Sequence, residues 1–274
     1  MLLIPAPFLV AFGLSAIIAL LAWRLRSLSL SGALAATLVG TVALLSSYGA
    51  GVYVVVWFGL ATILSQIGKA KKASRLADIV QKSSHRDAWQ VLANGGVFSA
   101  LMLSDIILGA QCDLFSGCGR ILVAAAAALA AAGADTWATE IGTLVGATPW
   151  SLRTASRVPT GTSGAITLAG TLSLFAGATA LAFLALLLGV VSGNRSVVAV
   201  AVGGCAGALA DTVLGAWVQE RRWCPRCTSE TEQRVHRCGT PTVYHCGLSG
   251  LNNDVVNFLC TIVGAAVALL LVLG

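Results

Sequence analysis

Long apolar segments recur along the whole chain and constrain its fold more than any other feature. Each is close to the 20 residues or so that an α-helix needs to cross the hydrocarbon of a bilayer. They lack the strict alternation of apolar and polar residues that a membrane β-barrel requires. Only 10% of the residues are charged and the mean hydropathy is +0.87, too little charge to coat a water-soluble domain. The sequence therefore predicts an all-α fold, a polytopic transmembrane helical bundle, as a single domain over residues 1–274.

About eight spans are expected from the lengths of these apolar runs. They cover residues 5–22, 30–48, 51–68, 88–108, 121–145, 166–191, 197–219 and 255–273. No charged residue precedes the first run, and no small-residue cleavage site followed by a soluble chain comes after it. We therefore expect this run to stay in the membrane rather than to be removed as a signal peptide.

Basic residues separate between the two sides of this predicted bundle. The loops after the first, third, fifth and seventh spans hold two, six, two and five of them, which is 15 of the 17 lysines and arginines. By the positive-inside rule these loops face the cytoplasm or its stromal equivalent, and both termini lie outside. No basic stripe is interleaved with aromatic residues, so nucleic acid is not an expected partner, whereas anionic membrane lipids are.

Carboxylates and amides gather near the basic end of four spans. An ionisable residue inside a membrane is costly, so each one is a functional hypothesis. Two spans share the sequence Ala-Asp-Thr, which places Asp135 and Asp211 at similar depth. The other members of this polar level are Asn94, Glu140, Gln219, Asn253, Asp254 and Asn257. Hydrogen bonding between helices is the alternative for the amides, but neighbouring carboxylates repel one another in a low dielectric. A divalent cation relieves that repulsion and oxygen ligands suit Mg²⁺, while transport of a cation or proton is the competing interpretation.

The segment between the fifth and sixth spans has features of an anion site. Arg153 and Arg157 precede a stretch rich in Gly, Thr and Ser that contains Gly161, Thr162 and Gly164. Arginine side chains and the backbone amides at a helix N-terminus both favour phosphate oxygens. An ordinary loop with a helix cap is the alternative.

Cysteine and histidine residues concentrate in the loop of residues 220–252, between the last two spans. Cys224 and Cys227 form a Cys-x-x-Cys pair, and Cys238 follows at a spacing typical of structural zinc sites. On a reducing side of the membrane, disulfides are not expected to persist. The fourth zinc ligand is left open between His236, His245 and Cys246, and free thiols in a folded loop are the alternative.

Four segments in this order resemble a known membrane family. They are RDAWQVLANGG at 86–96, ADTWATE at 134–140, RVPTGTSG at 157–164, and the Cys-x-x-Cys pair followed by NDVVN at 253–257. Together they resemble the family of plant phytyl-phosphate kinase, an enzyme of tocopherol biosynthesis, and animal transmembrane protein nineteen. The resemblance implies a multi-pass kinase that uses CTP or another NTP to convert an isoprenyl monophosphate, phytyl or geranylgeranyl, to the diphosphate. The membrane would be of the plasma, thylakoid or plastid-envelope type.

The chemistry of such a kinase suggests roles for the polar residues. A phosphate acceptor is already a nucleophile, so catalysis reduces to positioning and charge neutralisation. We expect Asp135, Glu140 and Asp211 to hold Mg²⁺ with the nucleotide. We expect the polar side chains of Asn94, Gln219, Asn253, Asp254 and Asn257 to complete the site. The phosphates would be bound by Arg86, Arg153, Arg157, Gly161, Thr162 and Gly164.

Three other functions are compatible with the same residues. A cytidylyltransferase would join CTP to a lipid phosphate and release pyrophosphate. A cation-coupled transporter would move ions through the carboxylates without consuming a nucleotide. A membrane scaffold would use the acids only to join helices. Association into a homo-oligomer is compatible with each of them.

Overall fold

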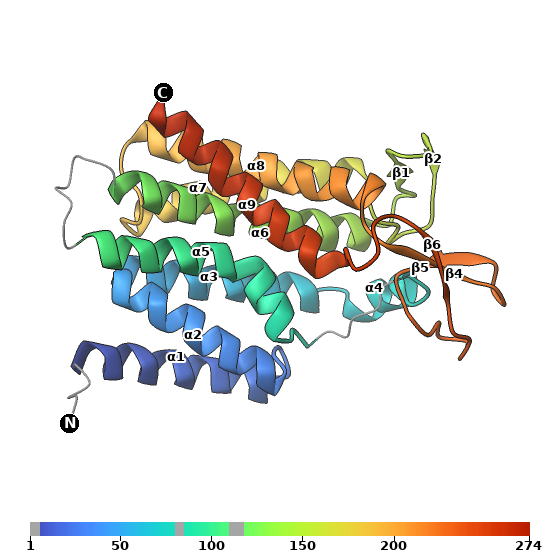
Figure 1. Cartoon of the computed structure of the whole chain (residues 1–274), viewed down its shortest axis with the longest axis horizontal. Coiled ribbons are helices and arrows are strands. Elements are labelled where there is room, and N and C mark those ends of the chain that lie inside the picture. Colours follow the sequence, from blue (N-terminus) through green and yellow to red (C-terminus); the bar gives the residue numbers. More distant parts are fainter. Residues whose placement is uncertain (1–5, 80–84, 110–117) are drawn as a thin grey trace.

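Eight apolar helices lie side by side in the computed structural model, which describes residues 6–79, 85–109 and 118–274 (Figure 1). They are α1 (Ala6–Arg24), α2 (Leu30–Ser46), α3 (Tyr48–Gln66), α5 (Ala88–Gly109), α6 (Cys118–Val145), α7 (Leu168–Leu187), α8 (Asn194–Trp217) and α9 (Asn253–Leu273). Seven are long and apolar enough to cross a membrane, and α2, with 17 residues, lies at the short end of the usual range. The predicted multi-pass transmembrane bundle is confirmed.

Hydroxyl side chains fix where three of these helices begin. Ser29, Ser47 and Thr167 each accept a hydrogen bond from the backbone N–H three residues later, at 3.0–3.1 Å. The first N–H groups of a helix have no partner within the helix, so each of these caps satisfies one of them. The observed starts lie close to those expected from the apolar runs.

Helix α6 is the centre of the bundle. It packs against α3, α5, α7, α8 and α9, and its alanine-rich run from 124 to 132 is almost fully buried. At Gly207 of α8 and Gly264 of α9, a Cβ atom would crowd Ala131 of α6. Small residues at these crossings let the backbones approach closely, which is how helices gain packing energy inside a membrane.

Short elements that the apolar pattern did not predict lie at one end of the bundle, opposite the start of α1 and the end of α9 (Figure 1). One is the basic helix α4 (Lys69–Leu76). An antiparallel sheet of order β2-β1-β3 joins β1 (Trp150–Ser151), β2 (Ser156–Arg157) and β3 (Ala165–Ile166). A second sheet of order β5-β4-β6, within residues 220–252, joins β4 (Arg221–Cys224), β5 (Ser229–Thr231) and β6 (Val243–Cys246). Strands of two to four residues are too short to give a periodic signal in the sequence.

Candidate functional site

A polar cavity of about 1290 Å³ lies at the end of the bundle that carries the two sheets. Its walls come from helices α3 to α9 and from the loops that join them at this end of the bundle. Most of the site residues expected from the sequence line it: Arg86, Asn94, Asp135, Glu140, Gly161, Thr162, Gly164, Asp211, Asn253, Asp254 and Asn257. The fold thus brings residues that are far apart in the sequence together around one cavity.

Four of the carboxylates that line this cavity influence one another's charge and are here called the acidic group: Asp135, Asp211, Glu232 and Asp254. Asp211 on α8 lies close enough to Asp135 on α6 and to Glu232 to experience their negative charges, and Glu232 likewise experiences that of Asp254. The Oδ2 atom of Asp211 is buried and has no hydrogen-bond partner within the described residues. Such an arrangement is unfavourable unless a cation or protons occupy it.

Glu232 is the member of the acidic group that sequence reasoning missed. Its Oε1 accepts hydrogen bonds from Ser163 Oγ and Gln219 Nε2, each at 2.8 Å. Burial raises the pKa of Glu232, and these two donors act in the opposite direction. Gln219, predicted to belong to the site, therefore reaches it through Glu232 rather than by lining the cavity. Glu232 sits among the cysteines of a loop, where no hydrophobic pattern marks it.

Glu140 has a different environment from the acidic group. It forms an ion pair with the buried Lys72 of α4 and accepts a hydrogen bond of 2.6 Å from Ser65 Oγ. Residues five apart on a helix point about 140° from each other around its axis, so Glu140 and Asp135 face different parts of the cavity. Lys72 also donates to the backbone oxygen of Leu64, at 2.6 Å.

Arg86 lies beside this ion pair. Its guanidinium donates to Thr62 Oγ1 at 3.0 Å and to Ser65 Oγ at 3.4 Å, and it stacks 5.3 Å from the centre of the Phe58 ring. Burial lowers the pKa of Arg86, and the charge of Glu140 opposes that effect. Together Lys72 and Arg86 form the basic group of the cavity.

The structure does not bring Arg153 and Arg157 to the cavity. Arg153 donates to Cys246 Sγ at 2.9 Å, whereas Arg157 donates to the backbone oxygen of Thr148 at 2.6 Å and lies over the Trp150 ring. Both are exposed, and neither lines the cavity. The cationic side chains that do line the cavity are Lys69, Lys72, Arg86, Arg222 and Arg234.

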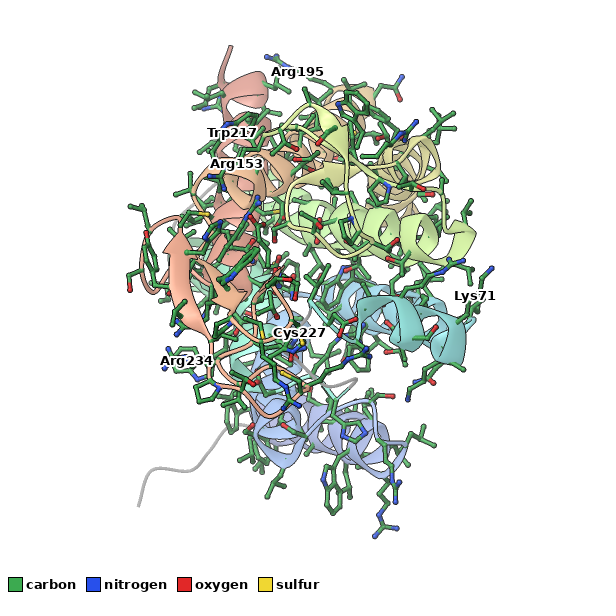
Figure 2. All side chains as sticks on the ribbon, turned by 90° about the vertical axis from the view of Figure 1, so that its right-hand side faces the viewer. Lys71, Arg153, Arg195, Trp217, Cys227 and Arg234 are labelled. Carbon is green, nitrogen blue, oxygen red and sulfur yellow. The ribbon has the colours of Figure 1, made fainter. Side chains whose placement is uncertain are left out.

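Next to the cavity, four side chains of the cysteine-rich loop converge: Cys224, Cys227, His236 and Cys238. Their potential ligand atoms all lie within 4.8 Å of one another. Figure 2 looks onto this end of the molecule, with Cys227 near its middle and Lys71 and Arg234 towards its margins. The other two candidates lie elsewhere: His245 Nε2 pairs with Glu230, and Cys246 contacts Arg153.

Comparison with known proteins places the chain among integral membrane proteins. The model of the integral membrane protein family DUF92 matches residues 13–265. The protein PGR of Arabidopsis thaliana is 30% identical over 263 residues, which cover 90% of this chain and 89% of the relative. An uncharacterised membrane protein of Methanocaldococcus jannaschii is 28% identical over 259 residues, covering 93% and 90% of the two chains. No solved structure matches the chain.

Proposed function

The chain belongs to the DUF92 family of integral membrane proteins, and from that premise we propose that it is a Mg²⁺-dependent kinase of an isoprenyl monophosphate. It would transfer the γ-phosphoryl group of CTP or another NTP at the cytoplasmic face of the membrane. The main support for the proposal is that one cavity, at the end of a membrane bundle, is lined by both the acidic group and the basic group. Phosphoryl transfer uses both, since it needs a metal–nucleotide and cations for phosphate oxygens.

The acidic group suits Mg²⁺ by the nature of its donors. Mg²⁺ prefers oxygen ligands and commonly takes one or two carboxylates together with substrate phosphates and water. The buried Asp211 Oδ2 supplies a carboxylate oxygen with no hydrogen-bond partner among the described residues, and Asp135 and Glu232 lie nearby. Bound there, Mg²⁺ would neutralise charge on the nucleotide phosphates. We assign Asp135 and Asp211 to this role.

The basic group suits the phosphate of the lipid acceptor. Lys72 and Arg86 already lie at the cavity wall, and Glu140 holds the Lys72 ammonium in place. An oxygen of the acceptor monophosphate would form a bond to the γ-phosphorus while the bond from that phosphorus to the β–γ bridging oxygen breaks. The products are an isoprenyl diphosphate and a nucleoside diphosphate. Because the acceptor phosphate is ionised near neutral pH, no side chain has to remove a proton.

Two exposed apolar side chains at the cavity suit a lipid tail. Trp89 of α5 and Leu209 of α8 line the cavity and are 73% and 43% exposed. Trp is favoured at the membrane interface, so we place the prenyl chain beside these residues in the bilayer, with its phosphate in the polar cavity.

The direct test incubates purified protein in detergent with Mg²⁺, CTP and phytyl or geranylgeranyl monophosphate. Mass spectrometry of lipid and nucleotide products should show isoprenyl diphosphate and CDP. A CDP-lipid with pyrophosphate would instead establish cytidylyl transfer. Cation uptake into sealed vesicles without nucleotide consumption would establish transport.

Substitution of the acidic group then tests the assignment of residues. Asp135→Asn and Asp211→Asn should each lower kcat by more than the roughly 10- to 100-fold typical of a residue that only supports a metal ligand. Asp105→Asn is the matched control, since Asp105 lies on α5 but does not line the cavity. Activity close to wild type in both cavity variants would overturn the assignment.

A further inference from the structure

We propose that Cys224, Cys227, His236 and Cys238 bind one Zn²⁺ ion, and that this ion fixes the loop of residues 220–252 at the rim of the cavity. The inference concerns metal binding and stability, so it stands independently of the proposed kinase activity. It also selects His236 as the fourth ligand, which the sequence pattern left open.

The spacing of the four side chains matches a tetrahedral zinc site. Zinc lies about 2.3 Å from thiolate sulfur and 2.0–2.1 Å from imidazole nitrogen, which places two tetrahedral thiolates roughly 3.8 Å apart. Cys224 Sγ and Cys238 Sγ are 3.7 Å apart, and His236 Nδ1 lies 3.2 Å from Cys238 Sγ. A Cys₃His set is one of the common structural zinc combinations.

Two neighbouring groups lie where they would support zinc binding: a carboxylate beside His236 and a backbone N–H beside Cys224. His236 is 2% exposed, and its Nε2 faces Asp78 Oδ1 at 3.7 Å, with Nδ1 turned toward the cysteines. Although 3.7 Å is longer than a hydrogen bond, a carboxylate on this side favours a proton on Nε2 and leaves Nδ1 free to bind the metal. The backbone N–H of Cys227 also donates to Cys224 Sγ at 3.4 Å, a contact that stabilises a thiolate.

The proposed zinc site would hold the loop against residues 77–79, the segment that follows helix α4. Glu232 N–H donates to the backbone oxygen of Ile79 at 2.9 Å, and Gln233 Nε2 donates to that of Ala77 at 3.0 Å. Asp78 pairs with Arg237 between these two contacts. Because residues 228–235 lie between the two pairs of ligands, a metal ion would close this segment into a loop. Glu232 and Arg234, which line the cavity, belong to that segment.

Metal content is the first measurement. Protein purified in detergent under reducing conditions and without chelators should contain about one zinc ion per chain by inductively coupled plasma mass spectrometry. Replacement of zinc by Co²⁺ should give the absorption of tetrahedral cobalt with a thiolate-to-metal charge-transfer band. No bound zinc together with no such cobalt spectrum would overturn the proposal, as would a disulfide between Cys224 and Cys238.

Two matched pairs of variants then identify the ligands. Cys227→Ser should lower zinc affinity by more than about 100-fold, whereas Cys246→Ser in the same sheet-bearing loop should retain the metal. His236→Gln should likewise lose zinc, whereas His245→Gln should keep it. Equal zinc content in both members of each pair would overturn the assignment. Since a variant can fail to fold, the cobalt spectrum of the unchanged protein provides the independent reading.

A chelator tests the structural role. Binding free energy at a structural zinc site contributes directly to folding. Removal of zinc from the wild-type protein should therefore speed proteolysis within residues 220–252 and lower the Tm, and added Zn²⁺ should reverse both. Unchanged proteolysis and Tm after proven loss of zinc would show that the ion does not fix the loop.

Discussion

The Lys72–Glu140 pair is an unusual feature for a membrane protein of so few charges. The side chains of Lys72 and Glu140 are 6% and 23% exposed, so both have lost most of their contact with solvent. Such a pair is costly to assemble, but removal of one partner leaves the other charge uncompensated. The pair therefore fixes α4 against the end of α6 and keeps a cation at the cavity wall.

Loss of this lysine should be far more damaging than loss of its neighbour. Lys72→Met is expected to lower the free energy of unfolding by about 3 kcal/mol, the low end of the range for a broken buried pair, because Glu140 loses its paired cation but keeps the Ser65 hydrogen bond. Lys71→Met on the exposed side of α4 should change it by no more than about 0.5 kcal/mol. Adding Glu140→Gln to Lys72→Met should recover part of the loss. Unfolding in detergent measures all three, and equal effects of the two lysine variants would contradict the importance of the pair.

At the scale of single residues, the sequence revealed the carboxylates within spans but not their partners. Asp135 and Asp211 stood out because a charge inside an apolar run needs an explanation. Glu232 and Lys72 lie in polar segments, where charges are common, and only the folding of distant loops onto the cavity gives them a role. Arg153 and Arg157 have the residue type and spacing of phosphate ligands, yet they contact Cys246 and Thr148 instead and do not line the cavity.

Among the elements, the contact between the loop just before β3 and the end of α8 depends on one glycine. Gly164 has a φ of +72°, and a Cβ atom there would overlap the backbone N and Cα of Ala216. The nearby Arg221 joins the same two segments, donating to the backbone oxygens of Ser163, Gly215 and Ala216 at 2.9–3.0 Å. This contact places Ser163 next to Glu232, so Gly164 affects the cavity through packing.

Substitution of Gly164 should reveal a clash in addition to backbone strain. Gly164→Ala is expected to destabilise the protein by about 1–3 kcal/mol from overpacking, beyond the roughly 1–2 kcal/mol cost of a left-handed alanine. Gly189→Ala is the control, because Gly189 has a φ of +67° but no atom of the described residues lies within 4 Å of the point that its methyl group would occupy. Thermal unfolding in detergent should show the larger loss for Gly164→Ala. Similar losses would mean that only the backbone conformation matters.

Secondary structure was predictable where the apolar pattern is long and not where it is short. The eight apolar helices follow from runs of about 20 residues, and their observed ends differ by a few residues from the expected ones. Helix α4 has eight residues and the strands two to four, so no window of hydrophobic periodicity could detect them. Their positions come from contacts between loops that are far apart in the sequence.

For the whole molecule, charge and architecture point to the same polarity. The start of α1 and the end of α9 lie at the same end of the bundle, and the cavity, α4 and the two sheets lie at the other (Figure 1). Most lysines and arginines belong to the loops at the cavity end. By the positive-inside rule we expect that end to face the cytoplasm or its stromal equivalent, where a nucleotide would be available to the proposed site.

A pair of engineered cysteines tests this polarity in intact cells. Lys71→Cys places a thiol on the exposed side of α4, and Gly274→Cys places one at the C-terminal end of α9. A membrane-impermeant maleimide should label Gly274→Cys on intact cells but Lys71→Cys only after permeabilisation, because the two lie at opposite ends of the bundle. The wild-type protein, with its own cysteines, gives the background. The reverse pattern would invert the orientation and place the cavity outside, and labelling of both from one side would contradict the end-to-end separation itself.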